Sequence, residues 1–288
     1  MASLKEVKGR IATVSNTQKI TSAMKMVASA KLHKAQAAIS NMLPYEERLH
    51  HLLTNLLKSK PDISSSFAIQ REVKKLAIIV VSSNSSLCGG FNSNVIRRVT
   101  EVLDNYSLMG KENILIYPIG KKVADALVKL GYSIQGDFQE LSAKPTFKEA
   151  SLLSEKLMQM FLKGDIDRIE MIYHHFRSTA SQVLTQQTYL PFDLKTDRES
   201  DSGMETDYIL EPSVNELMGE LIPKVLRLKL YTVLLDSNAS EHAARTMAMQ
   251  IATDNAEELL QELKLMYNKT RQQAITNELL DIVGGQMA

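Results

Sequence analysis

Residues 224–283 read KVLRLKLYTVLLDSNASEHAARTMAMQIATDNAEELLQELKLMYNKTRQQAITNELLDIV and contain neither glycine nor proline. These two residues destabilise helices most, so the stretch allows one uninterrupted helix. Alternate steps of three and four residues from Val225 meet mostly apolar side chains, which is the heptad pattern of a coiled coil. A Pro-Ser pair before the stretch suits a helix start, and Gly284-Gly285 suits a stop. The sequence therefore predicts a helix over 213–284, about 105 Å long.

A second heptad pattern runs from Leu4 to Leu56. Pro44 lies inside it and predicts a kink. At about 80 Å, this helix is shorter than the other by roughly 25 Å. The first helix joins the middle of the chain by its C-terminus, and the second joins it by its N-terminus. We therefore expect the two helices to pair antiparallel, with these two ends level. The longer helix would then overhang near Tyr267–Gly284, where apolar side chains on a single helix favour a partner protein.

Polar residues interrupt both heptad patterns. Such residues cost stability and fix the register of a coiled coil. Alternatively, the middle of the shaft is exposed to something besides its partner helix. The interrupting residues are Gln18, Thr21 and Lys25 in the first helix and His242, Thr246 and Thr253 in the second.

Between the helices, short apolar runs alternate with amphipathic ones, which is typical of an α/β layer domain. Thr146, with Glu149 three residues on, predicts a capping box at the start of one helix. We therefore predict a long antiparallel coiled coil of N- and C-terminal helices with a central Rossmann-like α/β domain, divided as 1–60, 70–210 and 211–288. The expected strands are 75–82, 114–119, 168–176 and 182–189, and the expected helices are 91–105, 121–130 and 146–163.

Composition argues against several classes of protein. The 288 residues have a net charge of +1, which argues against a chain built mainly to coat nucleic acid. Cys88 is the only cysteine, which excludes an internal disulfide. No run of about 18 apolar residues exists, so we expect no membrane span. The first 40 residues hold seven basic side chains and one acidic one. This segment also resembles a mitochondrial transit peptide, although the heptad pattern continues through it.

Candidate catalytic and ligand sites are few. The turn Leu87–Asn92 joins a strand to a helix and contains two glycines, but no GxGxxG or GK[ST] motif accompanies it, so the indication of nucleotide binding is weak. Cys88 has no defined triad partner. His174 and His175 lie on a strand and face opposite sides, which predicts one core and one surface histidine. We predict no catalytic residue, cofactor or metal in this chain.

Three blocks of sequence stand out, and they are IATVSNTQKIT (11–21) with AMKMVA (23–28), then VVS (80–82) with LCGG (87–90), and finally ASE (239–241), AAR (243–245), ATDNA (252–256), YNKTRQ (267–272) and ITNELLDI (275–282). These blocks resemble the gamma subunits of bacterial F-type ATP synthases, and the resemblance covers the whole chain. The chain departs from that family at Gly284-Gly285, where Gly-Ala is usual, and at Asn84-Ser85-Ser86, where an Asp or Lys pair with Gly is common.

The resemblance implies a central stalk. In this family the coiled coil enters a hexamer of three alpha and three beta subunits, and the α/β domain sits on the epsilon subunit and the membrane c-ring. The chain would be a non-catalytic rotor shaft that couples proton flow to ATP synthesis or hydrolysis at the beta subunits. We expect it to be a peripheral membrane protein on the cytoplasmic face of the bacterial inner membrane.

The resemblance also assigns contact residues, motif by motif. Cys88 would lie near the surface of a beta subunit, while Tyr208 and Glu211 match the region that meets the c-ring and epsilon. Two alternatives to the family assignment are an unrelated coiled-coil scaffold and a small nucleotide-using enzyme built on the α/β domain. For each assigned residue the alternative is a helix surface with no energetic role. The residues expected to meet the beta subunits along the shaft are Met24, Lys25, Met26, Arg245, Gln272, Thr276 and Glu278.

Overall fold

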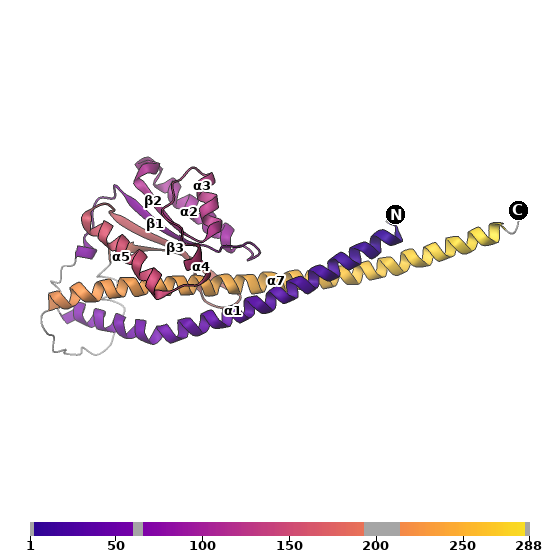
Figure 1. Cartoon of the computed structure of the whole chain (residues 1–288), viewed down its shortest axis with the longest axis horizontal. Coiled ribbons are helices and arrows are strands. Elements are labelled where there is room, and N and C mark those ends of the chain that lie inside the picture. The colour runs from indigo at the N-terminus through magenta and orange to yellow at the C-terminus, as the bar shows by residue number, and fades with distance from the viewer. Residues whose placement is uncertain (1–2, 60–65, 193–213, 286–288) are drawn as a thin grey trace.

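Two long helices form a rod that carries a single α/β head at one end (Figure 1). The computed structural model describes residues 3–59, 66–192 and 214–285. Helix α1 spans Leu4–Ser59 and helix α7 spans Val214–Gly285. These bounds confirm both predicted helices to within two residues. The Pro-Ser pair at the predicted start of the second helix lies outside the described residues.

The predicted strand and helix segments of the head are also confirmed, with small shifts at their ends. Among residues 66–192, the elements that the sequence missed are short: α4 and three turns of 3-10 helix. The elements of the head are η1 (Ser66–Ala68), β1 (Leu76–Val81), α2 (Phe91–Asn105), η2 (Ser107–Met109), η3 (Lys111–Asn113), β2 (Ile114–Ile119), α3 (Lys121–Lys129), α4 (Gln139–Ala143), α5 (Phe147–Lys163), β3 (Arg168–Phe176) and β4 (Gln182–Leu190).

The head contains a four-stranded sheet in the order β2-β1-β3-β4. Strands β2, β1 and β3 are parallel, whereas β4 runs antiparallel to β3 at the edge. All six residues of β1 are buried, as expected of a central parallel strand with both faces covered. The antiparallel edge strand is the one departure from a purely parallel arrangement. The predicted coiled coil with a central α/β domain is therefore confirmed in class.

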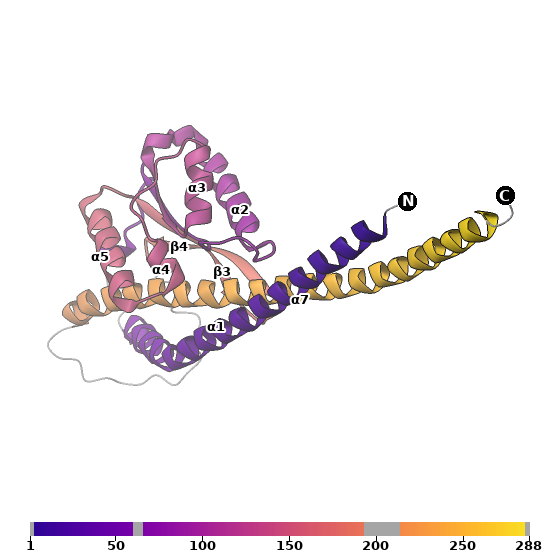
Figure 2. The ribbon, with the colours of Figure 1, turned by 45° about the vertical axis from the view of Figure 1, so that its right-hand side comes forward.

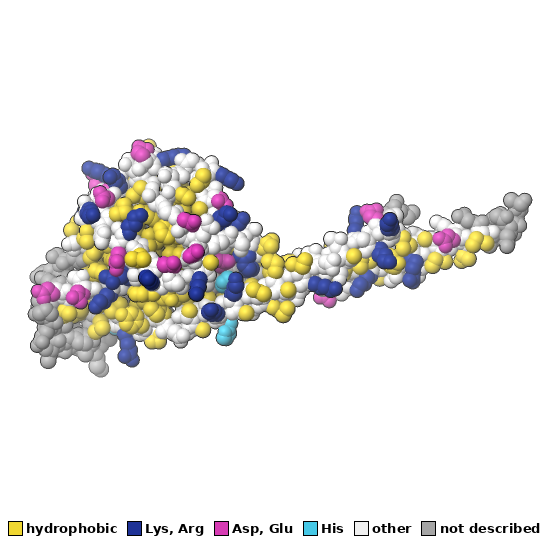
Figure 3. Space-filling model, in the orientation of Figure 1, with side chains coloured by type: hydrophobic (Ala, Val, Ile, Leu, Met, Phe, Trp, Pro, Cys, Tyr) yellow, Lys and Arg dark blue, Asp and Glu magenta, His cyan; other side chains and the backbone are white. Residues whose placement is uncertain are grey.

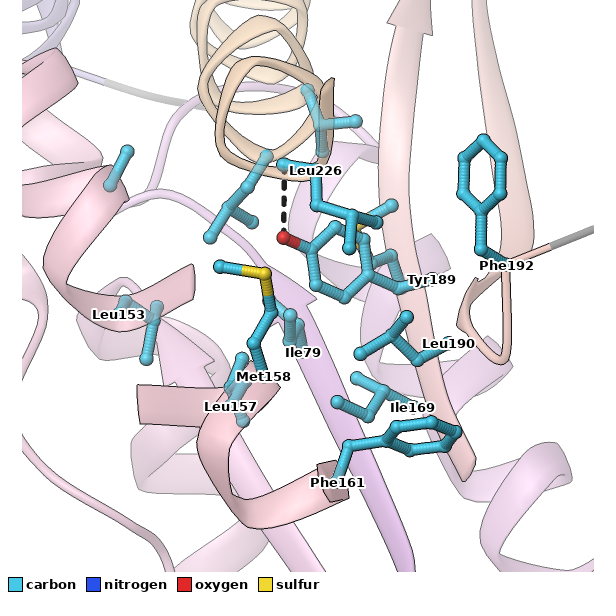
Figure 4. Packing of buried hydrophobic residues seen from close by; sticks show 14 of the residues in the cluster. Ile79, Leu153, Leu157, Met158, Phe161, Ile169, Tyr189, Leu190, Phe192 and Leu226 are labelled. Atoms are coloured by element: carbon cyan, nitrogen blue, oxygen red, sulfur yellow. Dashed lines mark hydrogen bonds between the residues drawn. The ribbon is translucent and has the colours of Figure 1, made fainter. Parts of the chain in front are cut away.

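Each face of the sheet packs against a different layer. Ile78 and Val80 face α2 and α3, while Ile79 and Val81 face the layer of α5 and α7. The latter core also contains the C-terminal turns of α1, through Leu53 among others. Figure 4 shows this packing around α7. The shaft is therefore one layer of the head rather than a rod attached to it.

A buried hydroxyl ties the sheet to α7. Tyr189 of β4 is fully buried, and its hydroxyl donates to the carbonyl oxygen of Leu226 at 2.9 Å (Figure 4). The same hydroxyl lies 2.6 Å from the Oγ of Ser154 on α5. One side chain thus connects three elements of the core.

The two long helices are antiparallel and are in close contact near Phe176, at the end of β3. Leu32 and Ala35 of α1 pack on Ala239 and Ala243 of α7, and small residues let helices approach closely. Further along, the hydroxyl of Thr253 donates to that of Thr21 at 2.8 Å, so two of the polar interruptions pair with each other across the coiled coil.

The longer helix overhangs, as predicted (Figures 1 and 2). The pairing of Thr21 with Thr253 places Leu4, the first residue of α1, beside about residue 270 of α7. Hydrophobic side chains recur along the exposed shaft in Figure 3. Beyond the end of α1, apolar side chains are exposed on α7; these are Ile275, Leu279, Leu280 and Ile282.

Replacing Tyr189 with phenylalanine tests the link between sheet and shaft. The Tyr189→Phe change keeps the ring but leaves the Ser154 hydroxyl without its partner in a fully buried place. We expect a loss of about 1–2 kcal/mol in the free energy of unfolding, measured by urea titration. Tyr117→Phe is the control, because Tyr117 as a whole residue is only 1% exposed and its hydroxyl donates to the Sδ of Met160, at 3.5 Å. Equal losses in the two variants would contradict the prediction.

Candidate functional site

The loop that follows β1 is folded tightly against the first turn of α2. The amide of Ser83 donates to Asn92 Oδ1 at 3.1 Å, and Asn92 Nδ2 donates to the Ser85 carbonyl at 3.3 Å and to the Sγ of Cys88 at 3.2 Å. Leu87 adopts a left-handed backbone with φ of +66°, which is uncommon for a leucine. Its side chain is exposed, while Cys88 is buried. The loop therefore presents Leu87 and covers the thiol.

Arg245 of α7 holds this loop against the shaft. Its Nη1 donates to the carbonyl oxygen of Ser86, and its Nη2 donates to Glu241 Oε1 at 2.7 Å. Both charged side chains are 11% exposed. A Cβ built on Gly89 would lie 3.9 Å from the Cβ of Ala248, so the loop backbone runs directly along α7. Arg245 thus connects the loop of the head to the shaft, in addition to any contact it makes outside the chain.

A cavity of about 350 Å³ lies where α1, α7 and this loop meet. Burial raises the pKa of Glu241, while the hydrogen bond and charge of Arg245 oppose that rise. Burial lowers the pKa of His242 to about 4, and the charges of Lys31 and Arg245 add to the effect. His242 is therefore neutral at pH 7. The residues lining the cavity are Ala23, Met24, Val27, Ala28, Lys31, Ser85, Glu241, His242 and Arg245.

The charges around this cavity suit an incoming carboxylate. Lys31 and Arg245 supply two positive charges, and Glu241 supplies the only negative charge among the lining residues. Hydrogen bonds from cationic donors to carboxylates are among the stronger ones in proteins. Met24 and Val27 add apolar surface beside them. The cavity can therefore hold an acidic side chain flanked by apolar ones.

The structure brings only some of the predicted contact residues to this place. Met24 lines the cavity, Lys25 beside it is half-buried, and Met26 is 66% exposed. Arg245 lies there too but is engaged inside the chain. The thiol of Cys88 is 1% exposed, so a contact at this loop would come from its neighbours. The assignment of these residues to a beta subunit stays a prediction.

The remaining predicted contacts lie elsewhere. Gln272, Thr276 and Glu278 are exposed on the overhang of α7, and the hydroxyl of Thr276 donates back to the carbonyl oxygen of Gln272 at 2.9 Å. At 1.5 Å per residue, Gln272 is roughly 40 Å along the helix from Arg245. The overhang is therefore a second, separate surface. The predicted foot contacts, Tyr208 and Glu211, lie outside the described residues.

Sequence reasoning did not assign Lys31, Ser85, Glu241 or His242 to the site. Glu241 and Arg245 are four residues apart, and this spacing could have suggested an ion pair on one helix face. Nothing in the sequence places Ser85 beside them. His174 is buried and the His175 side chain is 55% exposed, which confirms the prediction for that pair.

The described residues contain no group of three or more metal-ligating side chains close enough to hold a metal ion. In the same part of the chain, no helix is both long and apolar enough to cross a membrane.

The depressed pKa of His242 predicts acid sensitivity. Its folded pKa of about 4 is below its ordinary value of 6.5. The unfolded state therefore binds the proton first, and stability is lost as the pH falls through this window. The free energy of unfolding should fall for both proteins as the pH is lowered from 7.5 to 5.5. For His242→Asn this fall should be about 1 kcal/mol smaller than for the unsubstituted chain, measured by urea titration at each pH. His33→Asn, at an exposed position, is the control. The same pH dependence in all three proteins would refute the assignment.

Comparison with known proteins finds matches that extend over nearly the whole chain. The sequence profile of the family described as ATP synthase matches residues 3–288. The chain is 66% identical over 289 residues to the "ATP synthase gamma chain" of Phocaeicola vulgatus, covering all of both sequences. It is 58% identical to that of Bacteroides fragilis, again over all of both. With that of Flavobacterium johnsoniae it shares 46%, over 100% of this chain and 99% of the relative.

Solved structures share the fold at lower sequence identity. A chain of the Euglena gracilis mitochondrial ATP synthase matches with a TM-score of 0.65 and 21% identity, over 99% of this chain and 93% of that one. A chain of the Tetrahymena thermophila mitochondrial enzyme, in a structure of its central stalk and c-ring, matches with a TM-score of 0.59 and 22% identity, over 81% of this chain and 99% of that one. Profile, relatives and fold agree, and the chain belongs to the ATP synthase gamma chain family.

Proposed function

We propose that this chain is the central rotor shaft of an F-type ATP synthase, where it couples proton flow through the membrane sector to ATP synthesis or hydrolysis at the beta subunits. The proposal is supported mainly by the two long antiparallel helices, which form a rod and share a core with the α/β head. The second support is that the chain belongs to this family. Solved structures with the same fold include one of the central stalk and c-ring and one of the rotor of mitochondrial ATP synthases. The chain is a non-catalytic subunit, because the family's gamma chain is the stalk of the enzyme.

The shape of the rod explains how it can act without chemistry of its own. A single asymmetric shaft inside a ring of three like sites cannot contact all three in the same way. Each contact favours one conformation of the site that makes it, so the three sites differ at any moment. Turning the shaft passes each conformation to the next site. Nucleotide chemistry then belongs to the beta subunits, and the rod determines its timing.

The two surfaces of the shaft suggest two levels of contact with the hexamer. The cavity beside Met24 and Arg245, with its surplus of positive charge, suits an acidic loop of a beta subunit. The exposed apolar overhang of α7 suits the upper, inner part of the hexamer. The head would rest on the epsilon subunit and the c-ring, through a region that includes Tyr208 and Glu211. In this proposal the chain is a peripheral membrane protein on the cytoplasmic face of the inner membrane.

The direct test of the proposal is assembly. A tagged copy of the chain, expressed in its own cells, should pull down alpha, beta and epsilon subunits and the c-ring from solubilised membranes, identified by mass spectrometry. The purified chain alone should hydrolyse no ATP. Recovery of the chain without any ATP synthase subunit would refute the proposal, and so would ATP turnover by a preparation free of beta subunit.

Lys25 tests the contact with the acidic loop. It is half-buried and follows Met24, which lines the cavity, and its stem can extend so that the ammonium group reaches a partner. An ion pair there is worth at most about 1 kcal/mol and is weakened by salt. Lys25→Glu should therefore assemble normally but pump fewer protons per ATP hydrolysed, measured in inverted membrane vesicles. Lys25→Arg is the control and should pump normally. A Lys25→Glu enzyme that fails to assemble would contradict this assignment.

Leu263 tests the packed face of the coiled coil. Its side chain is 6% exposed, whereas Leu265, two residues away, is 71% exposed. Leu263→Asp buries a charge between the helices and should cost several kcal/mol of stability. Leu265→Asp should cost little in the isolated chain. Thermal melting of the two purified variants measures the difference, and yield of the assembled complex should fall for Leu263→Asp. Equal melting temperatures would show that the packed face is wrongly assigned.

A further inference from the structure

A second and larger cavity opens where α1 bends away from α7. It has a volume of about 710 Å³ and lies between the two long helices and the β3–β4 side of the sheet. The register fixed by Thr21 and Thr253 would set residues 39–49 of α1 against 225–236 of α7. Pro44 lies inside that part of α1, and the two helices visibly diverge there (Figure 2). The cavity therefore has a structural cause, because a proline bends a helix.

One wall of this cavity is apolar. Its side chains come from both helices and from the sheet, so no single element forms it. The main apolar contributors are Ile39, Met42, Phe192, Val225 and Leu228. A volume of this size is within the range of small-molecule sites, which are mostly apolar with a few convergent polar groups.

Acidic groups gather on another part of the lining. Glu46 and Glu47 of α1 and Asp236 of α7 line the cavity, together with Lys229 and His175. Burial, and then the charges of Asp236 and Glu46, raise the pKa of the Tyr173 phenol to about 12. Both of these carboxylates line the same cavity as Tyr173.

Hydrogen bonds hold this acidic wall in place. Asp236 Oδ1 accepts the amide of Phe176 at 2.8 Å, and Asp236 Oδ2 lies 2.5 Å from His175 Nδ1. Gln187 Nε2 donates to the hydroxyl of Tyr173 at 3.2 Å. The aromatic rings of Tyr173 and Phe176 face the same space. Carboxylates beside aromatic rings are the elements that recognise ammonium groups in proteins.

We propose that this cavity binds an amphipathic organic cation, with its ammonium group near Glu46 and Asp236 and its apolar body along the wall formed by Met42, Val225 and Leu228. Charge decides the class of ligand, because three carboxylates and one lysine line the cavity alongside His175. The smaller cavity should prefer anions instead, because positively charged side chains outnumber negatively charged ones in its lining. The proposed site is separate from the rotor function, since its lining contains none of the residues predicted to contact another subunit.

Isothermal titration calorimetry on the purified full-length chain tests the proposal. The probe is octyltrimethylammonium, used below its micellar concentration. Octanoate has a similar tail with the opposite charge, and tetramethylammonium has the head group without the tail. We expect saturable binding of one octyltrimethylammonium per chain, with octanoate and tetramethylammonium each at least about fivefold weaker. Equal binding of octanoate, or no saturable binding of octyltrimethylammonium, would overturn the proposal.

Two variants locate the binding. Glu46→Gln removes one carboxylate and should weaken octyltrimethylammonium about fivefold. Val225→Phe fills the apolar wall and should weaken it at least as much. Glu72→Gln, at a carboxylate that is 85% exposed and away from the cavity, is the matched control and should bind normally. Circular dichroism melts show whether each variant is folded. If folded Glu46→Gln and Val225→Phe bind as tightly as the control, the site is not in this cavity.

Discussion

The whole structure depends on α7 serving two cores at once. Its first turns belong to the core of the head, where Ile222, Leu226 and Leu230 pack under the sheet. A few turns later Ala239 and Ala243 belong to the coiled coil instead. Because one rigid helix crosses from one core to the other, the head cannot rotate about the shaft without breaking both. A twisting force applied to the head is therefore carried by backbone and packing rather than by a flexible joint.

Polar side chains reinforce this crossing where the apolar core of the head ends. Asp236 fixes the end of β3 through the amide of Phe176, and Ser240 donates to the carbonyl oxygen of His174 at 3.1 Å. Arg245 then holds the loop after β1. Asp236 and Ser240 are four positions apart and share a face of α7, whereas Arg245, five positions further on, lies on a different face. Hydrogen bonds depend strongly on geometry, so they fix the position of the head on the shaft, which apolar contacts alone would specify less sharply.

The sequence predicted the elements well because their signals are local. Periodicity, glycines and the capping box at Thr146 give nearly all the bounds, and the cap is present, with the Thr146 hydroxyl accepting from the amide of Glu149. The five-residue helix α4 has too few turns to show a period. The engagement of Arg245 depends on a contact with Ser86, which is 159 residues away in the sequence. No local pattern contains such a contact, so a motif can name these residues without giving their environment.

The same limit explains why neither cavity could be predicted from the sequence. Each forms where α1 and α7 meet a third element, and the opposite balance of charge in the two depends on which side chains the register brings together. Lys31 and Arg245 line one cavity, and Glu46 and Asp236 line the other. A shift of one helical turn between α1 and α7 would change which charged side chains of the two helices share a cavity, while leaving much of the apolar seam intact. The hydrogen bond between Thr21 and Thr253 is sensitive to such a shift. Polar residues in the seam therefore determine the electrostatic pattern along the shaft, at the stability cost that polar seam positions carry.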